Sequence, residues 1–378
     1  MILASHHEQI RDAVRRVARE RLAPNAARWD SDQHFPREEI GALAAMGLCG
    51  VAIPERWDGA GMDYTALALA CEEISAGDGS TCTVVMVTNL VANILYGYGN
   101  EAQKQQFLRP LAQGKQLGAF CLTEPHAGSD AAAISTRAEK SGADYVLNGV
   151  KQFITSGKTA DLAVVFAVTD KSAGKKGMSA FVVPTATPGY QVARIEDKTG
   201  QRASDTAQIV LENCRVPAAQ LLGEPGAGYR IALANLESGR INVAAQSTGM
   251  ARAALEAALA YAAQRKSMGK TLIEHQAVNF RLADMATGVE AARQLYLHAA
   301  QLRDSGAACL KQASMAKLFA SETAEKVCSD AIQIHGGYGY VADFPVERIW
   351  RDVRACQIYE GASDIQRLVI GRALEGGA

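Results

Sequence analysis

The sequence lacks the cysteine and histidine patterns that hold metals or disulfides. It has no Cys-x-x-Cys pair and no His-Glu-x-x-His, and its seven histidines form no clustered set, so we predict no metal site. Its eight cysteines are scattered without regular spacing and are mostly flanked by apolar residues. They indicate buried thiols in a reducing compartment rather than disulfides.

Long apolar runs and an excess of charge of one sign are also absent. No stretch approaches the roughly 18 uninterrupted apolar residues of a membrane span, and the N-terminal "MILASHHEQIRDAVRR" becomes polar too early for a signal peptide. The 39 basic and 40 acidic residues give a net charge of −1, so nothing indicates binding to nucleic acid or to an anionic membrane. We therefore expect a cytoplasmic protein with no membrane insertion.

No Rossmann fingerprint or P-loop is present. The nearest glycine-rich segment is "GEPGAGYR" at 223–230, which we interpret as a loop before a helix. A bound nucleotide would therefore not be held in Rossmann fashion. The length of 378 residues allows two or three domains.

The chain divides into three segments by its pattern of apolar residues. Residues 1–115 are helical in character, with amphipathic stretches such as "EQIRDAVRRVARERLAP" and "ALALACEEISAGD" separated by loops such as "PERWDGAGMDY". Residues 116–222 contain short runs such as "LAVVFAVT" and "SAFVVP" bounded by Gly, Pro, Asp and Ser, which predict an antiparallel β domain. Residues 223–378 are helical again. The pattern predicts a mainly α protein with a central β domain.

Two local patterns refine these segments. Asn148-Gly149, between two apolar runs, predicts a hairpin with a type I′ turn. In the last segment, apolar residues recur at alternating spacings of four and three, which predicts a bundle helix with a core-facing stripe. The stripe consists of Val278, Leu282, Met285, Val289, Ala292, Tyr296 and Ala299.

The stretch "IYEGASDIQ" at 358–366 places a glutamate just before a predicted helix. Ser363 and Gln366 match the capping-box pattern, and the following apolar residues predict a helix from about Asp364. Glu360 therefore lies in a loop upstream of a helix N-terminus. A solvated surface position is the default for a single glutamate, so its role depends on the rest of the chain.

Five separated blocks, in order and over essentially the whole chain, resemble the acyl-CoA dehydrogenase family of flavoproteins. The blocks are "CLTEPHAGSD" at 121–130, "KQFITSGK" at 151–158, "RKSMGKTLIEHQAV" at 265–278, "AIQIHGGYGY" at 331–340 and "RDVRACQIYEGASDIQR" at 351–367. The resemblance implies an N-terminal helical domain, a middle β-barrel or sandwich domain, and a C-terminal four-helix bundle. It also implies a homotetramer, a dimer of dimers, in which FAD lies between the β domain and the bundle and reaches a neighbouring subunit.

The resemblance assigns residues to FAD block by block. Phe153 would cover the flavin ring, Thr155 would hydrogen-bond near N5, and Arg265 of one subunit would meet the diphosphate bound by another. The full set is Phe120, Leu122, Thr123, Ser129, Phe153, Ile154, Thr155, Arg265, Ser267, Gln276, Gln333, Ile334, Gly336, Gly337, Ala362, Ser363 and Asp364. Phe153 stands where the family often has Trp, and either aromatic supplies an apolar face.

The same resemblance assigns the base and the substrate contacts. Some members of the family carry the catalytic glutamate at the position of Gly239, and most carry it in "YEG". Here the first position is empty and the second is filled by Glu360, which would take the α-proton of an acyl-CoA while flavin N5 accepts the β-hydride, giving a trans-2-enoyl-CoA. Electrons would pass to an electron-transfer flavoprotein. The substrate contacts would be Ser129, Glu237, Arg240, Tyr359 and Gly361.

Two departures from the family pattern concern the cofactor, and two residues bear on the substrate. Ala362 replaces a common Thr whose hydroxyl often bonds FAD, and His126 replaces a frequent Gly near the ring. Bulky Leu95 and Tyr96 favour a short or branched acyl chain. The pathway would be fatty acid or amino acid catabolism, including β-oxidation.

Three alternatives remain at this point. An acyl-CoA oxidase of the same fold is disfavoured by the compact length, and a flavin monooxygenase is disfavoured by Glu360. A non-catalytic helical scaffold is disfavoured by the joint presence of the base, the flavin block and Arg265.

Overall fold

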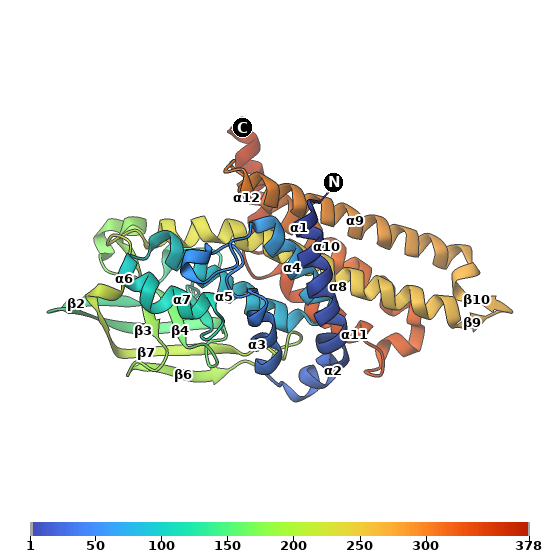
Figure 1. Cartoon of the computed structure of the whole chain (residues 1–378), viewed down its shortest axis with the longest axis horizontal. Helices are drawn as coiled ribbons and strands as arrows, with labels where there is room; N and C mark the ends of the chain where they lie inside the picture. Colours follow the sequence, from blue (N-terminus) through green and yellow to red (C-terminus); the bar gives the residue numbers. More distant parts are fainter. Residues whose placement is uncertain (1–2, 377–378) are drawn as a thin grey trace.

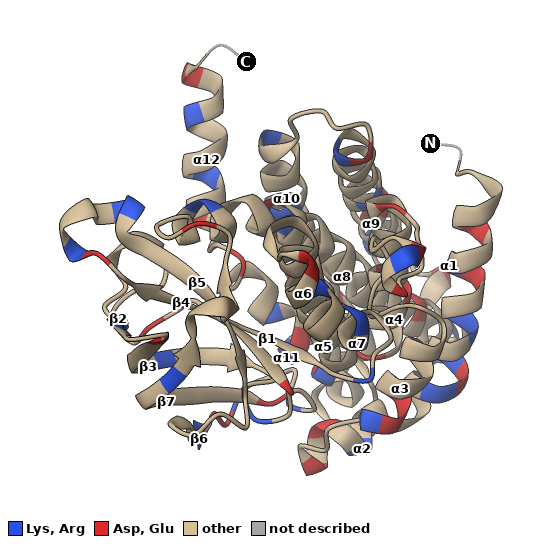
Figure 2. Ribbon diagram, turned by 60° about the vertical axis from the view of Figure 1, so that its left-hand side comes forward, with Lys and Arg blue, Asp and Glu red and all other residues tan. Residues whose placement is uncertain are grey.

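The computed structural model describes residues 3–376, which begin with a helical region. Its helices are α1 (Ser5–Val17), α2 (Ala23–Asp32), α3 (Arg37–Ala45), α4 (Tyr64–Gly77), α5 (Gly79–Tyr98), α6 (Glu101–Gln103) and α7 (Arg109–Ala112). Asp63 and Asp78 cap α4 and α5 by accepting hydrogen bonds from Ala66 N and Thr81 N. Acidic and basic residues mix along α1 to α3, on the outer side of this region (Figure 2).

Helix α5 is a core helix. It is long and apolar enough to span a membrane by length and composition, but 89% of its apolar window is buried inside the fold. It packs on the bundle helix α8 (Gly228–Gln264) and on strand β1 (Gly118–Cys121) of the sheet. Helix α5 therefore joins the helical parts to the β domain.

The middle region is an eight-stranded sheet at one end of the molecule (Figure 1). Its strands are β1 (Gly118–Cys121), β2 (Arg137–Ser141), β3 (Asp144–Thr155), β4 (Leu162–Val168), β5 (Met178–Pro184), β6 (Tyr190–Ile195), β7 (Thr206–Pro217) and β8 (Leu221–Leu222). The order is β6-β7-β3-β2-β4-β5-β8, with β1 also on β4. Pairing is antiparallel except that β1 and β2 run parallel to β4. The runs "LAVVFAVT" and "SAFVVP" form β4 and β5 as predicted, whereas β2, β6 and β8 were not predicted.

The predicted Asn148–Gly149 hairpin is wrong. Strand β3 continues through both residues, and the hairpin turn is Gly142–Ala143, between the paired Ser141 and Asp144. Register against β7 shifts between Leu147 and Gly149, so the dipeptide forms an irregularity in the strand. A Cβ at Gly149 would lie 2.4 Å from Thr136 Oγ1. The glycine therefore permits a close approach between neighbouring segments instead of a turn.

The last region contains three long helices and two shorter ones. They are α8 (Gly228–Gln264), α9 (Gln276–Asp304), α10 (Leu310–His335), α11 (Val346–Arg354) and α12 (Ser363–Glu375), with a small hairpin of β9 (Lys266–Ser267) and β10 (Lys270–Thr271) between α8 and α9. Helix α12 projects from the bundle, and the β9–β10 hairpin lies at the end opposite the sheet (Figure 1). The apolar stripe predicted for α9 is confirmed, with Val278 partly buried and the other members buried.

A buried charge network joins the N-terminal helices to the bundle. Glu72 accepts hydrogen bonds from Arg252 Nε at 3.1 Å, Arg293 Nη2 at 2.6 Å and Tyr296 OH at 2.5 Å. Burial opposes ionisation of Glu72, but the two arginines hold its pKa below the usual value. All eight cysteines are buried and free, as predicted.

Candidate functional site

The loop that carries Glu360 has an uncommon backbone conformation. Glu360 has φ +55° and Gly361 has φ +90°, and the first value is unfavourable for a residue with a side chain unless surrounding contacts maintain it. The Gly361 carbonyl accepts hydrogen bonds from Lys317 Nζ at 2.8 Å and from Gln366 Nε2 at 2.8 Å. Gln366 Nε2 also lies 3.1 Å from the Glu360 carbonyl. The loop is therefore fixed to both α10 and α12.

The capping box predicted for Ser363 and Gln366 is wrong. The N-cap of α12 is Ala362, and the amide of Gln366 turns back to the 360–361 carbonyls. The Gln366 side chain therefore bonds the loop at Glu360 and Gly361 instead of capping the start of α12. Within residues 3–376, Ser363 Oγ is buried and has no hydrogen-bond partner, so it is a donor that a ligand could use.

The carboxylate of Glu360 lies against Gly239 of α8. A Cβ added at Gly239 would lie 2.5 Å from Glu360 Oε2 and 2.9 Å from Cδ. The carboxylate therefore occupies space that any side chain at position 239 would need. The two alternative positions for a catalytic glutamate that the sequence suggests thus converge on one place in the fold.

The carboxylate is poised between neutral and ionised forms. Burial raises the pKa of Glu360 to about 7, against the opposing effect of the positive charges on Arg240 and Lys317. Among the described residues, Glu360 Oε2 is buried without a hydrogen-bond partner, and so is Arg240 Nε. A buried carboxylate with a free oxygen and a pKa near neutrality is suited to act as a general base.

Tyr359 is anchored by its hydroxyl in a buried polar network. Its OH donates to Gln246 Oε1 at 2.5 Å, accepts from Gln201 Nε2 at 3.2 Å, and lies 3.2 Å from Cys356 Sγ. Because the hydroxyl is already engaged, Tyr359 can offer a ligand its ring but not its polar end. The network ties the Glu360 loop to α8 and to the segment before β7.

A buried ion pair joins the two sequence blocks expected beside the flavin. Lys151 Nζ in β3 contacts Glu124 Oε1 at 2.8 Å and the Leu122 carbonyl at 3.0 Å. Gln152 N donates to the Thr123 carbonyl at 2.9 Å. Burial works against the charged form of Glu124, but Lys151 holds its pKa down at about 2. The segment 122–124 is therefore fixed against β3.

The predicted cofactor residues of the β domain differ in how much surface they present. Phe153 is 64% exposed at φ +57°, so a large apolar face stands open beside the sheet. Ile154 is 2% exposed and points into the core, while Phe120 packs on Phe166 with ring centroids 5.0 Å apart. Leu122 is buried, Phe120, Thr123 and Thr155 are half-buried, and Ser129 is exposed. Phe153 is the member of this group best placed to meet a bound ring.

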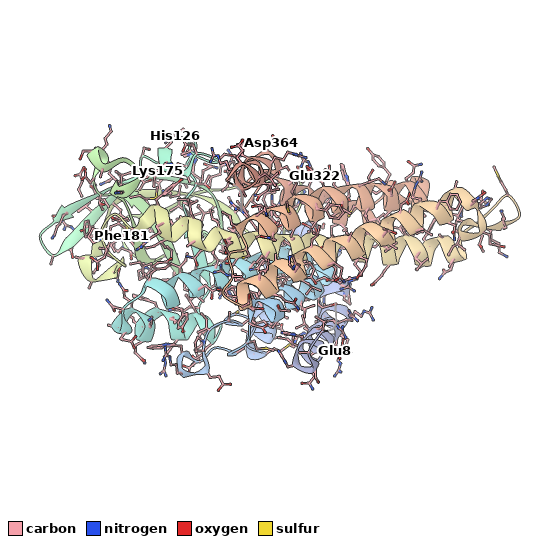
Figure 3. All side chains as sticks on the ribbon, turned by 90° about the horizontal axis from the view of Figure 1, so that it is seen from above. Glu8, His126, Lys175, Phe181, Glu322 and Asp364 are labelled. Carbon is pink, nitrogen blue, oxygen red and sulfur yellow. The ribbon has the colours of Figure 1, made fainter. Side chains whose placement is uncertain are left out.

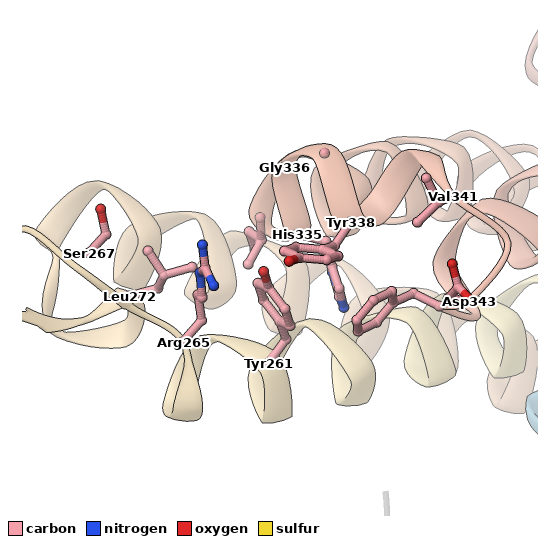
Figure 4. Close-up of a pocket in the computed structure, with 12 residues that line it drawn as sticks. Tyr261, Arg265, Ser267, Leu272, His335, Gly336, Tyr338, Val341 and Asp343 are labelled. Carbon is pink, nitrogen blue, oxygen red and sulfur yellow. The ribbon is translucent and has the colours of Figure 1, made fainter.

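A second group of predicted residues lines a pocket of about 690 Å³ at the far end of the bundle (Figure 4). Arg265, Ser267, Ile334, Gly336 and Gly337 belong to its lining. Its other walls include aromatic rings, and Tyr261 stacks on His335 with centroids 4.4 Å apart. The Arg265 guanidinium lies 5.6 Å from the centre of the Tyr338 ring. Gln276 and Gln333 are exposed and lie outside this lining.

The two groups are far apart within one chain. Gly239, beside Glu360, and Gln264, next to Arg265, lie on the same continuous helix, α8. At a rise of 1.5 Å per residue they are separated by roughly 40 Å. One chain therefore carries the two groups of predicted residues at different places along its bundle.

The two predicted CoA contacts on α8 are paired inside the chain. Glu237 Oε1 accepts a hydrogen bond from Arg303 Nη1 at 2.7 Å, and Cys309 Sγ lies 3.2 Å from the same oxygen. Arg240 is 7% exposed and donates to Ser314 Oγ at 3.2 Å. Arg240 is therefore buried, and its positive charge acts on the Glu360 carboxylate.

Sequence reasoning missed Lys317, which bonds the loop that carries Glu360. A signal was available, because Lys317 sits within a stripe of small residues at helical spacing, Ala313, Ala316 and Ala320, all of them buried. A lysine on such a face is expected to be buried and therefore to need a partner. The partner, Gly361, is 44 residues away in the sequence.

Three family models match this chain. They are the acyl-CoA dehydrogenase N-terminal domain at residues 4–115, the middle domain at 119–214 and the C-terminal domain at 226–375. A relative from Bacillus subtilis (strain 168), named acyl-CoA dehydrogenase, is 46% identical over the full length of both chains. The mitochondrial short-chain specific acyl-CoA dehydrogenase of Rattus norvegicus is 45% identical over 97% of this chain and 90% of its own length.

Solved structures share the fold. Butyryl-CoA dehydrogenase from Megasphaera elsdenii has a TM-score of 0.97 at 40% identity, with 99% of each chain covered. A chain from a structure described as the electron transferring flavoprotein of Acidaminococcus fermentans has a TM-score of 0.98 at 44% identity, with 99% of each chain covered. A glutaryl-CoA dehydrogenase from Mycobacterium smegmatis, in complex with FADH2, has a TM-score of 0.94 at 33% identity and covers 99% of this chain and 95% of its own.

Proposed function

This chain belongs to the acyl-CoA dehydrogenase family, and from that premise we propose that Glu360 is the base with which it dehydrogenates a short-chain acyl-CoA. The chain is an FAD-dependent oxidoreductase by family. The observation that carries the proposal is the Glu360 carboxylate, which lies against Gly239 with a buried free oxygen and a pKa of about 7.

The residues present fit FAD. Phe153 offers an exposed aromatic face, and Ser363 offers a buried hydroxyl without a partner in the described chain. At the far pocket, a Cβ at Gly336 or Gly337 would meet nothing within 4 Å, and Arg265 lies beside them. An open glycine backbone with a guanidinium suits a diphosphate, whose oxygens accept several hydrogen bonds. Ala362 lacks the hydroxyl that a Thr would offer to FAD, but the next residue, Ser363, offers its own hydroxyl.

Glu360 would take the proton from the carbon next to the thioester. When bound, FAD supplies the acceptor for the two electrons that leave with the β-hydrogen. At pH above about 7 the carboxylate is ionised and able to accept a proton. The next residue, Gly361, has no side chain that would block approach to the backbone. The N–H of Glu360 can therefore lie close to a thioester oxygen and stabilise the negative charge that develops on it.

A short acyl chain is the proposed substrate class. Two of the relatives that name a chain length, from Rattus norvegicus and Megasphaera elsdenii, are a short-chain specific enzyme and a butyryl-CoA dehydrogenase. Leu95, which the sequence suggested as a residue that shortens the pocket, is fully buried in α5 among apolar neighbours. Tyr96 is partly buried, and the centre of its ring lies 5.6 Å from Lys104 Nζ. The proposed chain length therefore rests on the named relatives and not on these two side chains.

A homotetramer and an electron-transfer flavoprotein are the proposed partners. The two partial sites lie roughly 40 Å apart on α8, so a second copy would complete each of them. Leu368 and Leu374 on the projecting helix α12 are 54% and 65% exposed, an apolar face that a second copy would cover. The similarity to a chain from the Acidaminococcus fermentans electron transferring flavoprotein structure supports the second partner.

The proposal is tested with purified protein and a panel of acyl-CoA thioesters. The protein should be yellow, and in the absence of oxygen butyryl-CoA should bleach its visible flavin absorbance faster than octanoyl-CoA or palmitoyl-CoA. Bleaching fastest with palmitoyl-CoA would overturn the short-chain assignment. Rapid peroxide formation in air would indicate an oxidase, and a colourless protein that takes up no FAD would contradict the function itself.

A further inference from the structure

Lys317 is a fully buried lysine, and no carboxylate in residues 3–376 forms an ion pair with it. Its side chain is 0% exposed, and its Nζ donates to the Gly361 carbonyl at 2.8 Å. Burying an ammonium group costs free energy unless other interactions compensate. The hydrogen bond to the carbonyl of Gly361, the residue directly after Glu360, offsets part of this cost.

The charged and titratable groups around this lysine come from three elements. Helix α8 contributes Arg240, α10 contributes Glu322 (labelled in Figure 3), and the segment between α11 and α12 contributes Glu360 itself and the Cys356 thiol. The group from α12 that shares its acceptor is the uncharged amide of Gln366. Burial lowers the pKa of Lys317 to about 8, an effect increased by Arg240 and opposed by Cys356, Glu360 and Glu322. Lys317 is therefore cationic at neutral pH.

We propose that Lys317 is a positioning residue, which fixes the Gly361 carbonyl so that Glu360 stays against Gly239, and whose buried charge beside that carbonyl favours the ionised form of the Glu360 carboxylate. The proposal rests on the proposed role of Glu360 as the base. Two effects follow from one side chain. The hydrogen bond maintains the positive-φ loop, and the charge favours the form of Glu360 that accepts a proton.

The chain contains a matched control for separating these effects. Gln366 donates to the same carbonyl at the same distance of 2.8 Å and also bonds the Glu360 carbonyl, but it carries no charge. Gln366→Met removes donors from the loop and leaves the charge. Lys317→Met removes both a donor and the charge. Only the second change should alter the protonation of Glu360.

The experiment measures the rate of anaerobic flavin bleaching by butyryl-CoA, in the FAD-loaded protein, from pH 6 to pH 9. In wild type the rate should rise with pH through the pKa of Glu360, near 7. Lys317→Met should move this rise to higher pH by about one pH unit and lower the plateau at least about tenfold. Gln366→Met should lower the plateau without moving the rise. Lys317→Arg, which keeps the charge, should restore the wild-type position of the rise.

A second readout does not depend on turnover. The infrared carboxyl band that is lost in Glu360→Gln should titrate at higher pH in Lys317→Met than in wild type. If both the bleaching profile and this titration keep their wild-type position in Lys317→Met, the proposed charge effect is wrong. If Lys317→Met does not take up FAD, the Lys317→Gln variant is measured instead and must show the same displacement. If instead the proposed role of Glu360 as the base is wrong, Glu360→Gln should turn over normally, and this result distinguishes that failure from failure of the Lys317 proposal.

Discussion

Replacing Glu360 with glutamine should stabilise the folded protein at alkaline pH and leave its stability unchanged at acidic pH. The physical reason is that burial raises the pKa of Glu360 from an ordinary 4.5 to about 7. Between these values the folded state retains a proton that the unfolded state has released. The free energy of unfolding of the wild type therefore falls as pH rises through this range and stays reduced above it. Glutamine does not ionise, so the variant escapes this loss.

The magnitude follows from the two pKa values. Each unit of difference corresponds to about 1.36 kcal/mol, so the gap between 4.5 and about 7 corresponds to at most about 3 kcal/mol. Part of the Glu360 residue is accessible to solvent, and water reduces electrostatic effects of this kind. We therefore expect Glu360→Gln to exceed the wild type by about 1 to 3 kcal/mol at pH 8.5 and to match it near pH 4.5.

The assay is urea unfolding followed by circular dichroism, at fixed protein concentration and with FAD in excess, because bound ligands and partner subunits shift apparent stability. Glu20→Gln serves as a control, since Glu20 is exposed and surface substitutions change stability little. A variant no more stable than wild type at pH 8.5 would mean that the Glu360 carboxylate is already well solvated or paired. The argument for its role as a base at neutral pH would then fail.

Three further changes test other parts of the structure. Gly239→Ala should reduce the bleaching rate about a hundredfold, because its Cβ would lie 2.5 Å from Glu360 Oε2. The control Gly41→Ala, where a Cβ meets nothing within 4 Å, should leave the rate unchanged. Equal rates in the two variants would contradict the placement of the carboxylate. Moving the base with the double change Glu360→Gly and Gly239→Glu should recover part of the activity lost in Glu360→Gly, measured by the same bleaching, and no recovery would argue against convergence of the two positions. Arg252→Met should lower the free energy of unfolding by about 3 kcal/mol, since it leaves buried Glu72 and Glu73 short of a partner. Arg19→Met removes an exposed ion pair with an N–O distance of 3.9 Å and should cost under about 1 kcal/mol in the same urea titration. Similar losses in the two variants would refute the distinction between buried and exposed ion pairs.

The elements that could be predicted from the sequence are those whose signal is local. The apolar stripe of α9 repeats over many turns, so its helix and its buried face follow from spacing alone. The core strands β4 and β5 follow in the same way from runs of β-branched residues. The position of Glu360 in a loop before a helix was also predictable, because turn residues and a periodic run adjoin there.

The failures concern residues whose conformation depends on a neighbouring segment. Asn148-Gly149 has the composition of a tight turn, but Thr136 lies so close that position 149 needs a glycine within a continuous strand. Gln366 has the spacing of a capping residue, but the strained loop before it competes for its amide. The small residues around Lys317 indicate that it is buried, but they do not indicate its partner. The acceptor, the Gly361 carbonyl, belongs to a loop that lies next to Lys317 because α10 packs on α12.

The most direct test of the central claim is the rate of anaerobic bleaching by butyryl-CoA at pH 8 in Glu360→Gln, compared with wild type at equal FAD content. Removing a general base typically costs 10²–10⁴ in rate. We predict a loss of at least about a thousandfold with FAD still bound, because, among the described residues, the charged groups that influence the pKa of Glu360 are Arg240 and Lys317 and include no second carboxylate. A rate within about threefold of wild type would contradict the assignment of Glu360 as the base.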